Sequence, residues 1–329
     1  MRRPQAPVWI AGLAAGAALA GLFAYARVAV RRFENLEPDS AGAPGAFLDV
    51  NGVRLHYLEA GRGEAVVLIH GLSASTFSFR HTIPELARYY RVVALDLKGA
   101  GYSARPAEGD YSLRTQASLV ERAMTRLGIE RAAVVGHSLG GAVAMRLALQ
   151  FPGRVTRLVL VDSATDGELR RSARLLSLLR PFVPIAALFT LHRPGFRRVS
   201  IRSVVHDPGH VTPAVVEGYF RPTRMKGHLR SLGALLADCR RDEPLRPEAI
   251  RQPTLILWGE HDRWLPLARG EDLAARIPGA RLEVVPSAGH LPLEEQPAYC
   301  NTALVAFLRA PEATVGSPQA GRTSQVAPG

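Results

Sequence analysis

The segment GHSLG at residues 136–140 places a serine between two glycines, at the spacing of a nucleophile turn. It directly follows an apolar run at 132–135, and a helical pattern begins just after the serine. In a strand, tight turn, helix setting the serine is held at a sharp bend, and Gly136 and Gly140 let the backbone fold that closely. We therefore expect Ser138 to be a nucleophile; the alternative is an ordinary turn with a solvated serine.

A serine hydroxyl is a poor nucleophile near neutral pH, so it needs a base, and the base needs an orienting carboxylate. At a turn of this kind the acid and then the histidine follow the nucleophile in chain order. Asp262 comes after the apolar run 255–258, and His290 comes after the run 282–285. Both loops lie at the same carboxyl edge of a parallel sheet, which predicts a catalytic triad of Ser138, Asp262 and His290.

An oxyanion hole needs backbone N–H groups where the tetrahedral intermediate becomes negative. Leu139 follows the nucleophile and supplies one amide. The apolar run 66–69 ends in a loop where Gly71 permits a sharp turn, and we expect the Leu72 amide to be the second donor. His70 is interpreted as structural support for this loop rather than as an acid or base.

The elements that must position these residues follow a strand, helix, strand, helix order. Short runs rich in Val, Leu and Ile suit strands buried on both faces, and helical patterns at 113–127 and 139–150 separate some of them. This order predicts a mostly parallel sheet covered on both sides. Two earlier segments, 47–50 and 53–59, are joined through Asn-Gly and predict an antiparallel hairpin. The buried runs are 66–69, 92–95, 132–135, 158–161, 255–258 and 282–285.

No strand-like run occurs between Asp166 and Pro253, where proline-interrupted helical stretches predict an inserted lid. Polar segments rich in Pro, Gly and Ser predict a linker near the N-terminus and a disordered tail. The predicted organisation is an N-terminal segment 1–33, a linker 34–45, an α/β core 46–165 and 252–309, a lid 166–251 and a tail 310–329.

Residues 8–26 contain neither a charge nor a proline, and arginines flank them on both sides. About twenty apolar residues span a bilayer core as a helix, so this stretch predicts a single-pass membrane anchor. The alternative is a cleaved signal, because Ala24-Tyr25-Ala26 has the form of a cleavage site, and the product would then be secreted or periplasmic. Because arginines stand on both sides, the sequence leaves the orientation open.

The composition is that of a globular protein and excludes collagen-like, coiled-coil and disordered classes. Lys and Arg number 41 against 29 Asp and Glu, a net charge of +12, and +8 of this falls in residues 166–251. The excess is therefore local, and we expect no nucleic-acid partner. Cys239 and Cys300 are too few for a disulfide scaffold and lack the spacing of a zinc site. We expect no metal and no cofactor.

These motifs together resemble the α/β-hydrolase superfamily, in the lid-bearing serine branch that includes monoacylglycerol lipases and small esterases. The resemblance covers residues 47–308 and implies an α/β-hydrolase fold, with a mainly parallel eight-stranded sheet, helices on both faces and a lid after the sixth strand. A membrane helix before such a domain is similar to membrane-bound monoacylglycerol lipases. The similar stretches are HGLSAS (70–75), DLKGAGYSARP (96–106), GHSLGG (136–141), LWGEHDRWLP (257–266) and AGHLPLEEQP (288–297).

Some positions depart from the family pattern or leave it open. Members often have proline where Lys98 stands and tryptophan where Phe79 stands, which would reshape the pocket. Epoxide hydrolases and haloalkane dehalogenases are similar elsewhere but use aspartate at the position of Ser138. Asp162 occupies the place where some relatives keep the acid, and it is the alternative to Asp262.

The expected function is hydrolysis of carboxylic esters, with an acyl-chain lipid such as a monoacylglycerol as the small-molecule substrate. The apolar lid stretch 175–191 suits an acyl tunnel or contact with a membrane, and arginines surround it; the alternative is a stretch packed on the core. Two other functions stay open, namely a carbon–carbon bond hydrolase of ring-fission diketones and a catalytically weak binding protein of the same fold. Acyl length, headgroup, membrane side and oligomeric state are not determined by the sequence.

Overall fold

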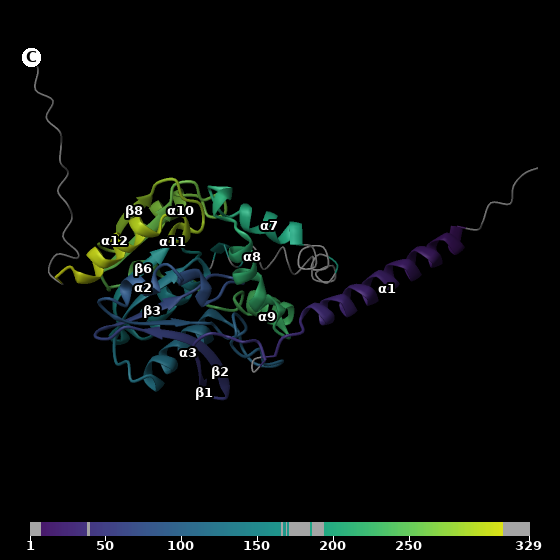
Figure 1. The fold of residues 1–329 in the computed structure, drawn as a ribbon, viewed down its shortest axis with the longest axis horizontal. Helices are drawn as coiled ribbons and strands as arrows, with labels where there is room; N and C mark the ends of the chain where they lie inside the picture. The colour runs from purple at the N-terminus through teal and green to yellow at the C-terminus, as the bar shows by residue number, and fades with distance from the viewer. Residues whose placement is uncertain are drawn as a thin grey trace, which may run out of the picture.

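The computed structural model describes residues 8–37, 40–165, 167–168, 170, 185 and 194–311. Eight strands form one sheet in the order β1-β2-β4-β3-β5-β6-β7-β8, with β2 antiparallel to both its neighbours and the other pairs parallel (Figure 1). The predicted fold class is confirmed. The strands are β1 (Ala46–Val50), β2 (Val53–Ala60), β3 (Ala65–Ile69), β4 (Arg91–Leu95), β5 (Ala132–His137), β6 (Val155–Val161), β7 (Thr254–Gly259) and β8 (Arg281–Val285).

The hairpin between β1 and β2 forms at the predicted Asn-Gly pair. Asn51 has φ 53° and Gly52 has φ 77°, and a two-residue turn with both φ values positive matches the twist of the flanking strands.

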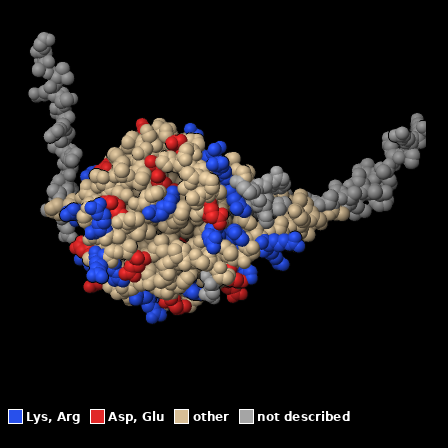
Figure 2. All heavy atoms as spheres, viewed as in Figure 1, with Lys and Arg blue, Asp and Glu red and all other residues tan. Residues whose placement is uncertain are grey.

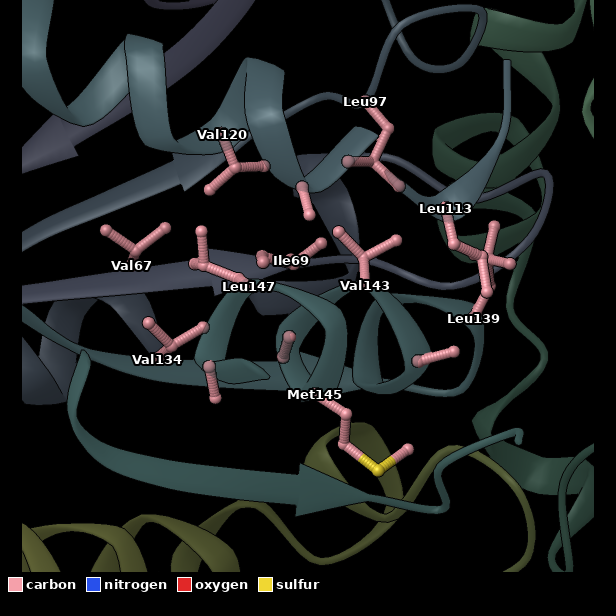
Figure 3. Packing of buried hydrophobic residues seen from close by; sticks show 14 of the residues in the cluster. Val67, Ile69, Leu97, Leu113, Val120, Val134, Leu139, Val143, Met145 and Leu147 are labelled. Atoms are coloured by element: carbon pink, nitrogen blue, oxygen red, sulfur yellow. The ribbon is translucent and has the colours of Figure 1, made fainter. Parts of the chain in front are cut away.

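The central strands are apolar at consecutive positions because each face of the sheet is covered. Alternate side chains of one strand point to opposite faces. Val67 and Ile69 of β3 therefore pack with Val143 and Leu147 of α4 (Leu139–Gln150), as Figure 3 shows. Their neighbours Val66 and Leu68 contribute to a second cluster on the other face.

Helices fill both layers and the connections. The helices of the core are α2 (Ile83–Leu86), α3 (Leu113–Arg126), α4, α10 (Ala268–Arg276), α11 (Pro292–Glu295) and α12 (Pro297–Arg309), with 3-10 turns η1 (Thr76–Phe79), η2 (Pro152–Arg154) and η6 (Pro247–Ala249).

Between β6 and β7 the described residues form a helical segment. It contains α7 (Pro194–Arg202), η4 (Pro208–His210), α8 (Pro213–Phe220), η5 (Arg221–Arg224) and α9 (His228–Asp238). Most of the predicted apolar stretch 175–191, and the predicted tail from residue 312 onward, lie outside the described residues. The division of the chain into domains stays a prediction.

The N-terminal helix α1 (Val8–Phe33) extends away from the sheet in Figure 1. The sequence predicts that residues 8–26 cross a membrane as an anchor, and this prediction is wrong. No helix in the described part of the chain has the length and apolar character that a crossing needs. Alanine and glycine fill much of this stretch and offer little apolar area per residue.

The end of α1 contacts the helical segment directly. Phe33 packs with Phe220 and Leu229. The Glu34 carboxylate accepts hydrogen bonds from the backbone N–H groups of Gly227 and Leu229, both at 2.8 Å. Since these amides lie at the start of α9, Glu34 satisfies donors that a helix N-terminus leaves open.

Charged side chains of both signs are interspersed over the visible face of the domain, and basic side chains gather beside the inner end of α1 (Figure 2). The excess positive charge is therefore unevenly distributed on this face.

Candidate active site

Ser138 lies at the bend between β5 and α4, with φ 53° and ψ −119°. A left-handed conformation is unfavourable for a residue with a side chain and persists where the surroundings fix it. The backbone provides this support, because Ser138 N–H donates to Val161 at 2.9 Å. A Cβ at Gly136 would overlap the Gly140 carbonyl, and one at Gly140 would overlap the Ile69 carbonyl. Both glycines are thus required by close backbone approach.

His290 and Asp262 lie beside this serine on the loops after β8 and β7. His290 Nε2 is 3.0 Å from Ser138 Oγ, and His290 Nδ1 is 2.6 Å from Asp262 Oδ2. Since the carboxylate accepts, Nδ1 carries the proton and Nε2 is left to accept from the serine hydroxyl. The structure therefore brings the three predicted residues into one hydrogen-bonded row.

Other contacts fix the orientation of the acid and the base. The second oxygen of Asp262 accepts from the Trp264 and Leu265 amides at 2.8 and 2.9 Å. The backbone N–H of His290 donates to Val204 at 2.7 Å, and the Trp264 ring stacks on the imidazole with centroids 5.9 Å apart.

Asp162, the alternative acid, occupies a different position in the site. Its Oδ1 accepts from the Gly259 amide at 2.9 Å, and it is Asp262 that is hydrogen-bonded to His290. Burial, followed by the neighbouring Asp262 charge, raises the pKa of Asp162 well above its usual range. The Asp162 carboxyl therefore keeps its proton to a higher pH than a free aspartate does.

Asp162, Asp262 and His290 also form a set of potential metal ligands, with ligand atoms within 4.8 Å of one another. The Asp262 oxygens already accept three N–H donors, from His290, Trp264 and Leu265. These hydrogen bonds fit a carboxylate that orients the His290 imidazole better than one that binds a metal ion.

Of the two predicted oxyanion donors, Leu72 lines the cavity and Leu139 directly follows Ser138 in the chain. Leu139 opens α4 beside Ser138, and Gly71 and Leu72 line the same cavity as Ser138. Leu97 N–H donates to His70 Nε2 at 3.1 Å, so Nδ1 carries the proton and donates to the Gly71 carbonyl at 2.7 Å. Burial lowers the pKa of His70, and the ring is placed as a neutral brace of the loop.

Asp96 is a supporting residue to which the sequence reasoning assigned no role. It is fully buried and accepts from Thr76 N–H at 2.7 Å, Tyr102 N–H at 2.8 Å and His56 Nδ1 at 2.7 Å. Although burial opposes it, the His56 hydrogen bond and charge contribute to a lowered pKa of Asp96. The sequence signal that could have indicated this role is the position of the aspartate directly after β4.

Glu295 is a second supporting residue that was missed. It is 3% exposed, and its carboxylate accepts from Gly289 N–H at 2.8 Å, His206 N–H at 2.6 Å and Asp207 N–H at 3.2 Å. It therefore joins the loop that carries His290 to the helical segment. Burial raises the pKa of Glu295 despite these donors.

A cavity of about 330 Å³ opens beside Ser138 and His290. His137, the neighbour of Ser138, also lines it; its Nε2 donates to the His290 carbonyl at 2.8 Å, and burial lowers its pKa to about 3. Apolar side chains of the helical segment and the His290 loop form much of the wall, namely Ile201, Val204, Phe220, Leu229, Leu232 and Leu291.

The comparisons with known proteins agree with this geometry. The family described as alpha/beta hydrolase fold matches residues 64–297 of the chain. The chain belongs to this family. An uncharacterized hydrolase of Bacillus subtilis (strain 168), YugF, is 31% identical over 269 residues, which are 79% of this chain and 96% of that protein.

Two further relatives of this α/β-hydrolase have more specific names. A 2-hydroxy-6-oxo-6-phenylhexa-2,4-dienoate hydrolase of Comamonas testosteroni is 30% identical over 79% of this chain and 93% of its own length. The crystal structure of a membrane phospholipase A, a bacterial virulence factor, superposes with a TM-score of 0.67 and 26% identity, covering 92% of this chain and 96% of that chain. The chain is thus a hydrolase of the α/β-hydrolase fold.

Proposed function

We propose that this hydrolase cleaves carboxylic esters through Ser138, His290 and Asp262. The observation that carries the proposal is the row of two hydrogen bonds, 3.0 Å from Ser138 Oγ to His290 Nε2 and 2.6 Å from His290 Nδ1 to Asp262. A nucleophile, a base and an orienting acid in this geometry are the requirements of acyl transfer.

In this mechanism His290 Nε2 takes the Ser138 proton while Ser138 Oγ attacks the ester carbonyl carbon. Asp262 stabilises the imidazolium that forms, and the Leu72 and Leu139 amides donate to the oxyanion. The alcohol leaves with the proton from His290, which gives an acyl-enzyme. Water then repeats the sequence and releases the acid.

The substrate we propose is an ester with an apolar acyl chain. Six aliphatic or aromatic side chains of the cavity wall suit a hydrocarbon chain, because burial of apolar area drives such binding. The similarity to a membrane phospholipase A over 92% of this chain supports a lipid ester.

A second candidate is carbon–carbon bond hydrolysis, which the similarity to the Comamonas testosteroni enzyme favours. The dienoate in that enzyme's name carries a carboxylate, which needs a cation or several N–H donors when it is buried. The described residues that line the cavity include no Lys, Arg, Asp or Glu, and their side chains are apolar groups, hydroxyls, imidazoles and the Trp264 indole. It is therefore better matched to a neutral ester.

Hydrolysis rates across esters with acyl chains of two to sixteen carbons test the proposal. We expect turnover with a preference for medium or long chains, and a loss of at least about 10⁴-fold in kcat for Ser138→Ala. Ser200→Ala is the matched control, since Ser200 lines the same cavity away from the bend, and its rates should stay within about threefold of wild type.

Two results would contradict the proposal. One is a wild-type protein that hydrolyses none of the esters but cleaves a 2-hydroxy-6-oxohexa-2,4-dienoate. The other is a Ser138→Ala variant that keeps the wild-type ester rate.

A further inference from the structure

Thr223 and His228 are two of the polar side chains that line the cavity from the helical segment. Thr223 lies in η5 and is 4% exposed, and His228 lies at the start of α9 and is 5% exposed. The proposed mechanism uses neither of them. Since buried polar groups are normally hydrogen-bonded, their bonding state needs an explanation.

The imidazole of His228 is unsatisfied. Among the described residues neither ring nitrogen has a hydrogen-bond partner, and Nδ1 is fully buried. Burial, with a smaller contribution from the Arg105 charge, lowers its pKa to about 3. The ring is therefore neutral and offers one N–H donor and one nitrogen acceptor.

Thr223 is satisfied only as a donor. Its hydroxyl donates to the Phe220 carbonyl at 2.7 Å, so the oxygen retains lone pairs that can accept. Together Thr223 and His228 present acceptors and one donor, which is the complement of a hydroxyl group.

Both residues are held in place by contacts with other parts of the chain. The Arg105 guanidinium is buried, donates to the Gly101 carbonyl at 2.6 Å and reaches the Pro222 carbonyl at 3.4 Å, next to Thr223. Glu34 binds the amides on either side of His228. Fixed, incompletely bonded polar groups in a cavity favour a ligand over a packing role.

We propose that Thr223 and His228 form a subsite for a free hydroxyl group on the alcohol part of the ester, so that the substrate is a partial ester of a polyol. The hydroxyl donates to Thr223 Oγ1 or to the imidazole nitrogen and accepts from the imidazole N–H. A plain alkyl alcohol leaves the ring unpaired, which costs affinity. This inference rests on the proposed ester hydrolysis.

The test compares a glyceryl monodecanoate with ethyl decanoate, which share the acyl chain and differ in free hydroxyl groups. For His228→Phe we expect kcat/KM on the glyceryl ester to fall about tenfold, and for Thr223→Val about threefold, with ethyl decanoate changed less than twofold. Leu232→Met is the matched control, a similar-volume change in the same wall that should leave the ratio of the two esters unchanged.

Equal losses on both esters for His228→Phe and Thr223→Val, or no change in their ratio, would overturn the subsite. Binding of ethers that cannot be hydrolysed, measured in a variant without the nucleophile, distinguishes failure of the subsite from failure of the proposed function. Ser138→Ala should bind 1-O-decylglycerol about tenfold more tightly than decyl ethyl ether, and His228→Phe in that background should remove the difference. If wild type cleaves neither ester, the proposed function fails, while the ether comparison still decides the subsite.

Discussion

Two pairs of residues that line the cavity, Ser138 with His290 and Thr223 with His228, differ in how their polar groups are bonded. On the side of the sheet, Ser138, His290 and Asp262 are hydrogen-bonded to one another at 2.6 to 3.0 Å. On the side of the helical segment, the His228 ring has no partner among the described residues and Thr223 uses only its proton. We propose that the catalytic row is organised before a substrate binds, whereas a hydroxyl group of the substrate completes the hydrogen bonding of Thr223 and His228. Chemistry and selectivity are thus assigned to different elements, and variants on each side should have different kinetic effects.

The largest effect should come from the base on the sheet side. His290→Ala removes the acceptor of the Ser138 proton, and we expect kcat for an ester to fall by about 10⁵-fold. Steady-state rates with the melting temperature as a folding check measure this. A fall of tenfold or less in a folded variant would contradict a preorganised catalytic side.

The two neighbouring carboxylates should behave differently. Asp262→Asn loses the charge that orients His290, and we expect about a 10⁴-fold lower kcat. Asp162→Asn keeps the shape of the side chain and leaves the bond between His290 and Asp262 in place, so kcat should stay within about threefold. Equal losses for both variants would show that the acid function is shared.

Asp162 should also affect stability in a pH-dependent way. Its pKa is raised in the folded state above the unfolded value of about 3.9, so the folded protein binds more protons. The free energy of unfolding therefore falls as pH rises from about 4 toward the raised pKa. Asp162→Asn removes this contribution, and urea unfolding at pH 5 and pH 8 should show the variant gaining on wild type at the higher pH. A constant difference would contradict a raised pKa.

A smaller effect is expected at Glu295, which joins the His290 loop to the helical segment. Glu295→Gln keeps the shape but replaces one acceptor oxygen by a donor, which weakens the bonds from Gly289, His206 or Asp207. We expect about a tenfold lower kcat with little change in KM, because the His290 loop is displaced while the cavity wall remains. A change confined to KM would contradict this role and would indicate that Glu295 affects substrate binding instead of the position of His290.

The smallest effect should come from the contact that supports the helical segment. Glu34→Ala removes acceptors from the start of α9, and we expect a loss of about 1 kcal/mol and faster hydrogen exchange at the Gly227 and Leu229 amides. The rate on a short ethyl ester should change less than twofold. Glu37→Ala is the control, since Glu37 is half-exposed and pairs with Lys226 at the surface. Unchanged hydrogen exchange in Glu34→Ala would contradict the stabilisation of the start of α9 by Glu34.

Much of the sheet could be predicted from local patterns. Runs such as 66–69 and 132–135 are apolar at every position because both faces of the sheet are covered. The alternation with helices predicted a mostly parallel sheet, and the family resemblance implied eight strands; the order in which the strands pair was not predicted. The positions of Ser138, Asp262 and His290 followed from their places after strands, and the catalytic roles of these residues stay predictions.

Residues whose roles depend on distant contacts were not predicted. Asp96 follows β4 directly, but its contacts with Thr76 and His56 are distant in sequence, as is the contact of Glu295 with His206. The bonding state of His228 depends on everything packed around it. The N-terminal anchor was predicted from the length of an uncharged stretch, and length alone did not decide whether that helix is apolar enough to cross a membrane.

The most direct test of the central claim is the site of covalent labelling by a fluorophosphonate, read by mass spectrometry of the digested protein. The probe reacts with a serine whose proton is removed by a neighbouring base. We expect one adduct, on Ser138, formed rapidly in wild type and at least a hundredfold more slowly in His290→Ala. An adduct on another serine, or labelling of Ser138 at the same rate in both proteins, would contradict the assignment of Ser138 and His290 as nucleophile and base.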